Sequence, residues 1–271
     1  MREVTDESGR RLTLPQKIER VVSLAPNMTE VIYAVGAGDR LVGVTTFCNY
    51  PPEAQTVAKV GDTMQPNIES IIALRPQLVL VSTASQLEAF TRQMDQQKIP
   101  VYVTNPRDLD GVLRTIQAIG DLLNEADRAL AVVKDLRART EAVYAAVHSR
   151  PPVKVFYQTS AKPLYTAGRD SFITDVIRRA GGTSVTADVE GAWPKYSDES
   201  ALASQPDAII IPSFDSMNKN AAKLADSLAN SPAAKNGRVY EINGDFLSRP
   251  GPRLLNGLEE MARKLHPEAF K

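Results

Sequence analysis

Two loops of the sequence carry side chains that are well suited to contact a ligand. Phe47 and Tyr50 lie in a loop that contains two consecutive prolines, and the only tryptophan, Trp193, lies next to a proline in a polar stretch. Aromatic rings offer large apolar faces to a ligand, although a ring in such a loop could equally fold back onto the core. A third loop, 243–253, is rich in polar and turn residues.

Motifs for catalysis are absent from the sequence. Gly36 and Gly38 lie where a helix is expected to end and lack the third glycine of a dinucleotide-binding fingerprint, and no GxxxxGK[ST], GxSxG or HExxH motif occurs. The single Cys48 excludes an internal disulfide, and the two histidines, His148 and His266, argue against a His-rich metal site or a Ser-His-Asp triad. These absences favour a binding function, with a cytosolic α/β enzyme as the alternative.

Composition narrows the class of protein further. The 271 residues are 43% apolar and 24% charged, and the formal net charge is zero, which argues against a nucleic-acid-binding surface. The sequence has no apolar run of the roughly 20 residues that a membrane span requires. The first eight residues are polar and contain no signal-peptide core, so we expect either a cytosolic protein or one whose signal peptide is absent from this sequence.

Strands and helices alternate along the chain, which predicts an α/β fold with mainly parallel sheets. Asn27 is predicted to cap a helix, with Glu30 three residues later as in a capping box. Further helices are predicted at 86–97, 109–123, 170–180 and 221–228, and one more runs to about Leu265. The apolar runs predict strands at 21–24, 41–45, 78–81, 101–103, 153–157, 209–211 and 238–242, with a short strand or turn at 164–168.

One stretch of sequence occurs twice. Glu69–Pro76 reads Glu-Ser-x-x-Ala-x-x-Pro and leads into an apolar run, and Glu199–Pro206 repeats this pattern 130 residues later. Each copy predicts a short helix that ends before proline, followed by a buried strand. The repetition favours two lobes of similar design over a chance recurrence of helix–Pro–strand junctions.

The segment 124–149 lies between the two copies. Apolar residues recur there every three or four positions without glycine or proline, which predicts a helix of about 36 Å. We interpret this helix as a rigid link between an N-terminal lobe, 1–123, and a C-terminal lobe, 150–271. The alternative is an ordinary packing helix of one domain.

These features resemble the periplasmic substrate-binding proteins of metal-chelate ABC importers, which take up vitamin B12, haem or iron siderophores. The resemblance covers nearly the whole chain from Arg20, and its motifs are Arg20–Glu30, Asn49–Pro52, Asn67–Glu69 and Ala73–Val79. It implies two Rossmann-like lobes joined by one long helix, with the ligand held in a cleft between the lobes. It also implies a periplasmic or otherwise extracytoplasmic protein that is not an enzyme.

Within this family the sequence is most similar to the vitamin B12 receptors. A corrinoid is a broad, mostly apolar disc edged with amides, so aromatic rings suit its faces and charged side chains suit its rim. Thr63 or Met64, and the segment 82–84, stand where those receptors have tryptophans, which leaves room for a related corrinoid. The resemblance assigns ligand binding to Phe47, Tyr50, Met64, Tyr165, Trp193, Asp245, Phe246 and Arg249.

Other ligands of the family remain open from the sequence. Haem receptors ligate iron through tyrosine, for which Tyr50, Tyr165 and Tyr196 are candidates. An anionic ferric siderophore would be bound by cationic side chains, and the candidates for this role are Lys195, Arg249 and Arg253.

The resemblance also implies partners. We expect a monomer that has no cofactor of its own, binds a small metal chelate and docks on the dimeric permease of an ABC importer. Glu69 and Glu199 occupy the positions of the two glutamates, one per lobe, that contact permease arginines in this family. Each could alternatively be a first-turn acid that the helix dipole favours.

Overall fold

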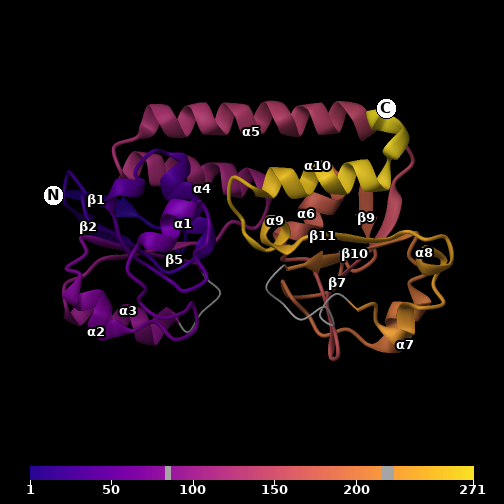
Figure 1. Ribbon diagram of the computed structural model, residues 1–271, viewed down its shortest axis with the longest axis horizontal. Coiled ribbons are helices and arrows are strands. Elements are labelled where there is room, and N and C mark those ends of the chain that lie inside the picture. The colour runs from indigo at the N-terminus through magenta and orange to yellow at the C-terminus, as the bar shows by residue number, and fades with distance from the viewer. Residues whose placement is uncertain (83–86, 215–222) are drawn as a thin grey trace. The chain divides into compact units, whose positions relative to one another are not determined.

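A computed structural model describes residues 1–82, 87–214 and 223–271 of the protein (Figure 1). The chain divides into two compact units. Unit 1 comprises Met1–Pro106 and Asp110–Asp135, and unit 2 comprises Arg107–Leu109 and Leu136–Lys271. Both units are α/β, as the sequence predicts, and each has its own mainly parallel sheet.

Unit 1 contains four parallel strands in the order β4-β3-β5-β6. All four were predicted from apolar runs. The strands are β3 (Val21–Ser23), β4 (Leu41–Val44), β5 (Leu78–Ser82) and β6 (Val101–Thr104). The helices are α1 (Pro26–Ala34), α2 (Ile68–Ala73), α3 (Leu87–Gln96) and α4 (Leu109–Leu122), with short 3-10 turns at Gly38–Arg40 and Pro52–Thr56.

Unit 2 repeats this strand order as β9-β7-β10-β11, again parallel, and adds β8 antiparallel to β7. The strands are β7 (Val153–Ala161), β8 (Leu164–Thr166), β9 (Gly182–Ser184), β10 (Ala208–Ser213) and β11 (Val239–Asn243). The helices are α6 (Phe172–Arg179), α7 (Asp198–Ala203), α8 (Pro232–Lys235), α9 (Gly244–Ser248) and α10 (Leu254–Leu265), with 3-10 turns at Asp226–Leu228 and Pro267–Phe270.

The sequence repeat is reproduced in the geometry of the backbone. Asn67 and Ser197, 130 residues apart, cap α2 and α7 by accepting a hydrogen bond from the backbone N–H three residues later. Arg75 and Gln205, again 130 apart, adopt φ values of 48° and 44° immediately before proline. Each copy therefore ends its helix and enters its buried strand by the same turn.

The long helix α5 (Ala126–Val147) confirms the helix that the sequence predicts over 124–149 (Figure 1). Its 22 residues correspond to about 33 Å. The division between the units falls inside it, between Asp135 and Leu136. In unit 2 its second half lies beside α10, where Arg139 Nε binds Glu259 Oε1 at 2.8 Å.

Several sequence predictions were wrong or incomplete. Asn27 does not cap α1, because the helix begins at Pro26 after Ala25, and both Asn27 and Glu30 are buried within it; proline's fixed φ suits the first helical turn. The helix predicted at 221–228 lies partly outside the described residues, and Asp226–Leu228 form only a 3-10 turn. The sequence does not predict β9, α8, α9 or the hairpin of β1 (Arg2–Thr5) and β2 (Arg11–Leu14).

The β1–β2 hairpin is anchored to β6 through the buried carboxylate of Asp6. This carboxylate accepts hydrogen bonds from the backbone N–H groups of Ser8, Arg10 and Val103 at 3.0, 2.9 and 3.3 Å. The Arg10 Nε also donates to it, at 3.1 Å. Burial acts to raise the pKa of Asp6, but these bonds outweigh burial and hold the pKa below its ordinary value.

Replacing this carboxylate should destabilise unit 1. Asp6→Asn is expected to lower the free energy of unfolding at neutral pH by about 1–3 kcal/mol, because the amide nitrogen cannot accept the bonds that Arg10 Nε and the Val103 N–H donate to Oδ2. Since the folded-state pKa lies below the ordinary value of 3.8, the contribution is present above that pH and is lost as the pH falls through the folded pKa.

Urea unfolding of the wild type and Asp6→Asn at pH 7 and pH 3 tests this, and the difference between the two proteins should be smaller at the lower pH. Glu3→Gln, at an exposed position of the same hairpin, is the control and should match the wild type. A difference between Asp6→Asn and wild type that does not change with pH would contradict the assignment.

Candidate functional site

In unit 1, Phe47 and Tyr50 lie on a loop that is held by a buried thiol. The hydroxyl groups of Thr29 and Thr45 lie 3.1 and 3.2 Å from Cys48 Sγ, and Cys48 is 1% exposed. The rings on either side of this anchor are outside the core, since Phe47 is 58% exposed and Tyr50 is 44% exposed. Neither ring folds back onto the core.

Met64 lies on the neighbouring loop of unit 1. The backbone N–H of Thr46 donates to the carbonyl of Gly61 at 2.9 Å and ties the two loops together. The Asp62 carboxylate accepts from the N–H groups of Met64 and Gln65 at 2.7 and 2.6 Å and fixes the turn. The Met64 side chain is 60% exposed, and an exposed thioether is an adaptable apolar contact.

In unit 2, the side chain of Trp193 is only partly packed on the core. One side of its ring system packs against buried aromatics, at 6.0 Å and 80° from Phe172 and 6.4 Å from Tyr157, yet the side chain is 43% exposed. Such edge-to-face packing fixes the orientation of the indole. The Trp193 ring is therefore held in place by packing on one side, and another part of it faces solvent.

Tyr165 belongs to β8, which lies next to the segment that contains Trp193. Tyr165 pairs with Lys195 in an antiparallel bridge, and the N–H of Gly168 donates to the carbonyl of Ala192 at 3.0 Å. A side chain at Gly168 would approach the Gly191 oxygen to 2.3 Å, so glycine permits the two segments to lie this close. The structure thus places Tyr165, which is half-buried, on the segment adjoining Trp193.

Asp245, Phe246 and Arg249 are brought together by α9. Asp245 Oδ1 binds Arg249 Nη2 at 2.9 Å, and its Oδ2 lies 3.7 Å from Arg253 Nη2. The Arg253 guanidinium also lies 5.4 Å from the centre of the Phe246 ring, a cation–π distance. We call Asp245, Arg249 and Arg253 the Asp245 cluster; with two cations and one anion it carries a net positive charge.

The structure also shows where the other predicted binding and docking residues lie. Glu69 and Glu199 are exposed in the first turns of α2 and α7. Tyr196 is half-buried and packs 5.9 Å from Phe156. Among the described residues no group of three or more His, Cys, Asp or Glu side chains could hold a metal ion.

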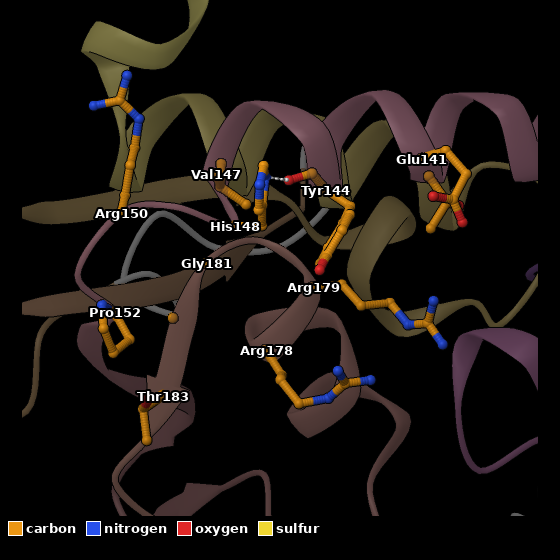
Figure 2. Close-up of a pocket in the computed structure, with 12 residues that line it drawn as sticks. Glu141, Tyr144, Val147, His148, Arg150, Pro152, Arg178, Arg179, Gly181 and Thr183 are labelled. Atoms are coloured by element: carbon orange, nitrogen blue, oxygen red, sulfur yellow. Dashed lines mark hydrogen bonds between the residues drawn. The ribbon is translucent and has the colours of Figure 1, made fainter.

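A separate hollow of about 560 Å³ lies on unit 2 against the last turns of α5 (Figure 2). It contains none of the predicted ligand-binding residues. Several of its charged side chains already have internal partners: Arg178 and Arg179 bind Asp175, and Arg150 binds Glu268. Its place in the fold therefore gives no support to a role in the family's ligand binding.

No described helix is both long and apolar enough to cross a membrane. The model of one protein family, described as periplasmic binding protein, matches residues 21–245. The chain belongs to the periplasmic binding protein family.

Relatives within this family agree with that assignment. The chain is 33% identical to an ABC transporter substrate-binding lipoprotein, YvrC, of Bacillus subtilis, over 99% of this chain and 86% of the relative. It is 30% identical to a vitamin B12-binding protein of Vibrio cholerae, over 94% of this chain and 91% of the relative.

Solved structures show the same fold. The periplasmic vitamin B12 binding protein BtuF of Vibrio cholerae matches with a TM-score of 0.83 and 29% identity over 95% of this chain and all of that one. The periplasmic haem-binding protein RhuT of Roseiflexus sp. RS-1 matches with a TM-score of 0.80 and 25% identity over 93% of this chain and 99% of that one. The protein is thus a substrate-binding protein of the ABC importer type and not an enzyme.

The Asp245 cluster should contribute to the stability of unit 2. The side chains of Asp245, Arg249 and Arg253 are only 22%, 11% and 15% exposed. Asp245→Ala removes the carboxylate that both arginines contact, and we expect it to lower the free energy of unfolding by about 1–3 kcal/mol.

Thermal unfolding of the ligand-free protein measures this effect. Asp226→Ala is the matched control, because it removes an aspartate of the same unit whose ion pair with Lys162 is largely exposed. The control should leave the melting temperature unchanged. Equal melting temperatures for Asp245→Ala and wild type would show that the cluster does not stabilise the fold.

Proposed function

We propose that this protein captures a corrinoid, a vitamin B12-like metal macrocycle, and delivers it to the permease of an ABC importer. The observation that carries the proposal is a set of large apolar side chains held exposed on anchored loops, namely Phe47, Tyr50, Met64 and Trp193. In unit 2, Asp245 and Arg249 add hydrogen-bonding groups suited to an amide rim. The similarity to the vitamin B12-binding protein of Vibrio cholerae supports the same ligand class.

Haem is the second candidate ligand. The similarity to the haem-binding protein RhuT and the exposed phenol of Tyr50 favour it, since a tyrosinate can ligate ferric iron. Histidine ligation has less support, because His148 lies near the end of α5 and His266 is buried against the Gly181 carbonyl.

The proposal extends to the rest of the importer. We propose that the protein acts outside the cytoplasm as a monomer without a cofactor of its own. The segment 124–149 would link an N-terminal lobe, 1–123, to a C-terminal lobe, 150–271. Glu69 and Glu199 would dock on a permease dimer, one glutamate from each lobe. Their matched places in two copies of one turn support this role.

Ligand binding is tested directly with cyanocobalamin, haemin and ferric siderophores. After incubation and desalting, the wild type should retain about one cobalamin per chain, as seen by absorbance, and calorimetry should give the dissociation constant. Retention of haemin with a shifted Soret band, and no cobalamin, would replace the corrinoid by haem. Retention of none of the three would reject this ligand class.

Docking is tested by charge reversal. Glu69→Arg and Glu199→Arg should each reduce transport in vesicles that contain the cognate permease by tenfold or more, because like charges would face the permease arginines. Cobalamin affinity should not change. Glu88→Arg and Glu190→Arg, at exposed positions of the two units, are the matched controls and should transport normally. Loss of cobalamin binding in either docking variant would assign these glutamates to the ligand site instead.

A further inference from the structure

The proposed function assigns no role to Phe214. It directly follows β10, the strand that lies between β7 and β11. The parallel register pairs Ser213 with Asn243, so Phe214 and Gly244 both lie just beyond the carboxyl ends of neighbouring strands. In open parallel sheets this is the edge where ligands bind.

The ring of Phe214 packs against the backbone of Gly244. A Cβ atom added to Gly244 would lie 2.4 Å from both Cε1 and Cζ of Phe214 and 2.6 Å from Cε2. These distances are shorter than any normal contact, so the outer edge of the ring occupies the space that a side chain at position 244 would need. Gly244 is buried and begins α9, and Asp245 and Phe246 follow it directly.

Phe214 is half-buried, so the contact with Gly244 does not cover the whole side chain. A phenyl ring at the carboxyl edge of the sheet, next to the first turn of α9, adds apolar surface close to the Asp245 cluster. The position 130 residues earlier is Ala84, which lies outside the described residues, and the sequence has no aromatic residue there. Unit 2 therefore supplies an aromatic side chain at this point of the repeat that the sequence of unit 1 lacks.

We infer that Phe214 contacts the bound metal macrocycle and that Gly244 is required because it leaves room for the Phe214 ring. The apolar ring suits the face or an apolar edge of the macrocycle, while Asp245 and Arg249 suit its polar rim. This inference rests on the proposed function, and it names a specificity-determining residue that the family resemblance did not assign.

Three variants test the inference. Phe214→Ala removes the ring, Phe214→Leu keeps apolar cover over Gly244 without an aromatic face, and Gly244→Ala keeps the ring but displaces it. Phe270→Ala is the matched control, because Phe270 is also half-buried in unit 2 but packs on Arg263 near the C-terminus. Calorimetry with cyanocobalamin gives the dissociation constant, and thermal unfolding without ligand shows whether each variant is folded.

We expect Phe214→Ala and Gly244→Ala each to raise the dissociation constant about tenfold, which corresponds to about 1.4 kcal/mol. Phe214→Leu should give a smaller increase, and Phe270→Ala should bind like the wild type. Folded Phe214→Leu and Gly244→Ala proteins with wild-type affinity would overturn the inference, because the ring would then only cover the backbone. A wild type that retains no cobalamin would instead reject the proposed corrinoid. The same variants titrated with haemin would then decide the role of Phe214, and unchanged haemin affinity would overturn it.

Discussion

Each sheet depends on an interior strand that directly follows the repeated helix–Pro turn and lies between two parallel neighbours, β5 in unit 1 and β10 in unit 2. Each strand is entered by a turn whose residue before proline, Arg75 or Gln205, has a positive φ. This conformation costs an ordinary residue about 1–2 kcal/mol and is held by the capped helix before it and the strand ladder after it. Because side chains along a buried strand are enclosed, groups that meet a ligand must lie beyond the strand ends.

The loop that carries Phe47 and Tyr50, and the segment 223–225 of unit 2, are held by buried polar anchors. Cys48 Sγ accepts from the Thr29 hydroxyl in unit 1, and Gln158 in unit 2 donates to the Lys223 carbonyl at 3.0 Å and accepts from the Ala225 N–H at 2.9 Å. Such satisfied buried groups fix a loop without using its large apolar side chains. Phe47 and Tyr50 can therefore remain exposed on an ordered backbone, which reduces the entropy that binding would otherwise cost.

The sequence alone predicted the elements that depend on local residue patterns. Uninterrupted apolar runs specified the buried strands, and the spaced apolar residues of 124–149 specified α5. It did not specify β9, because Gly182-Thr183-Ser184 has no apolar run and becomes a strand only by pairing with β7. The capping prediction at Asn27 failed because Pro26 begins the helix one residue earlier. The polar side chains of 243–253 form the Asp245 cluster only because the fold brings Asp245 within reach of two arginines, a contact that spacing alone does not show.

The Asp245 cluster bears on which ligand the protein prefers. An anionic siderophore that displaced Asp245 from Arg249 or Arg253 would leave the Asp245 carboxylate without that charge partner at low exposure. A neutral amide can instead donate to the carboxylate and accept from a guanidinium while the ion pair stays intact. The cluster therefore supports the proposed ligand through the amides of its rim, and the exposed rings support it through its apolar faces. The corrinoid that we propose combines both properties, whereas the carboxylates of a haem offer the arginines a competing anion, as a siderophore does.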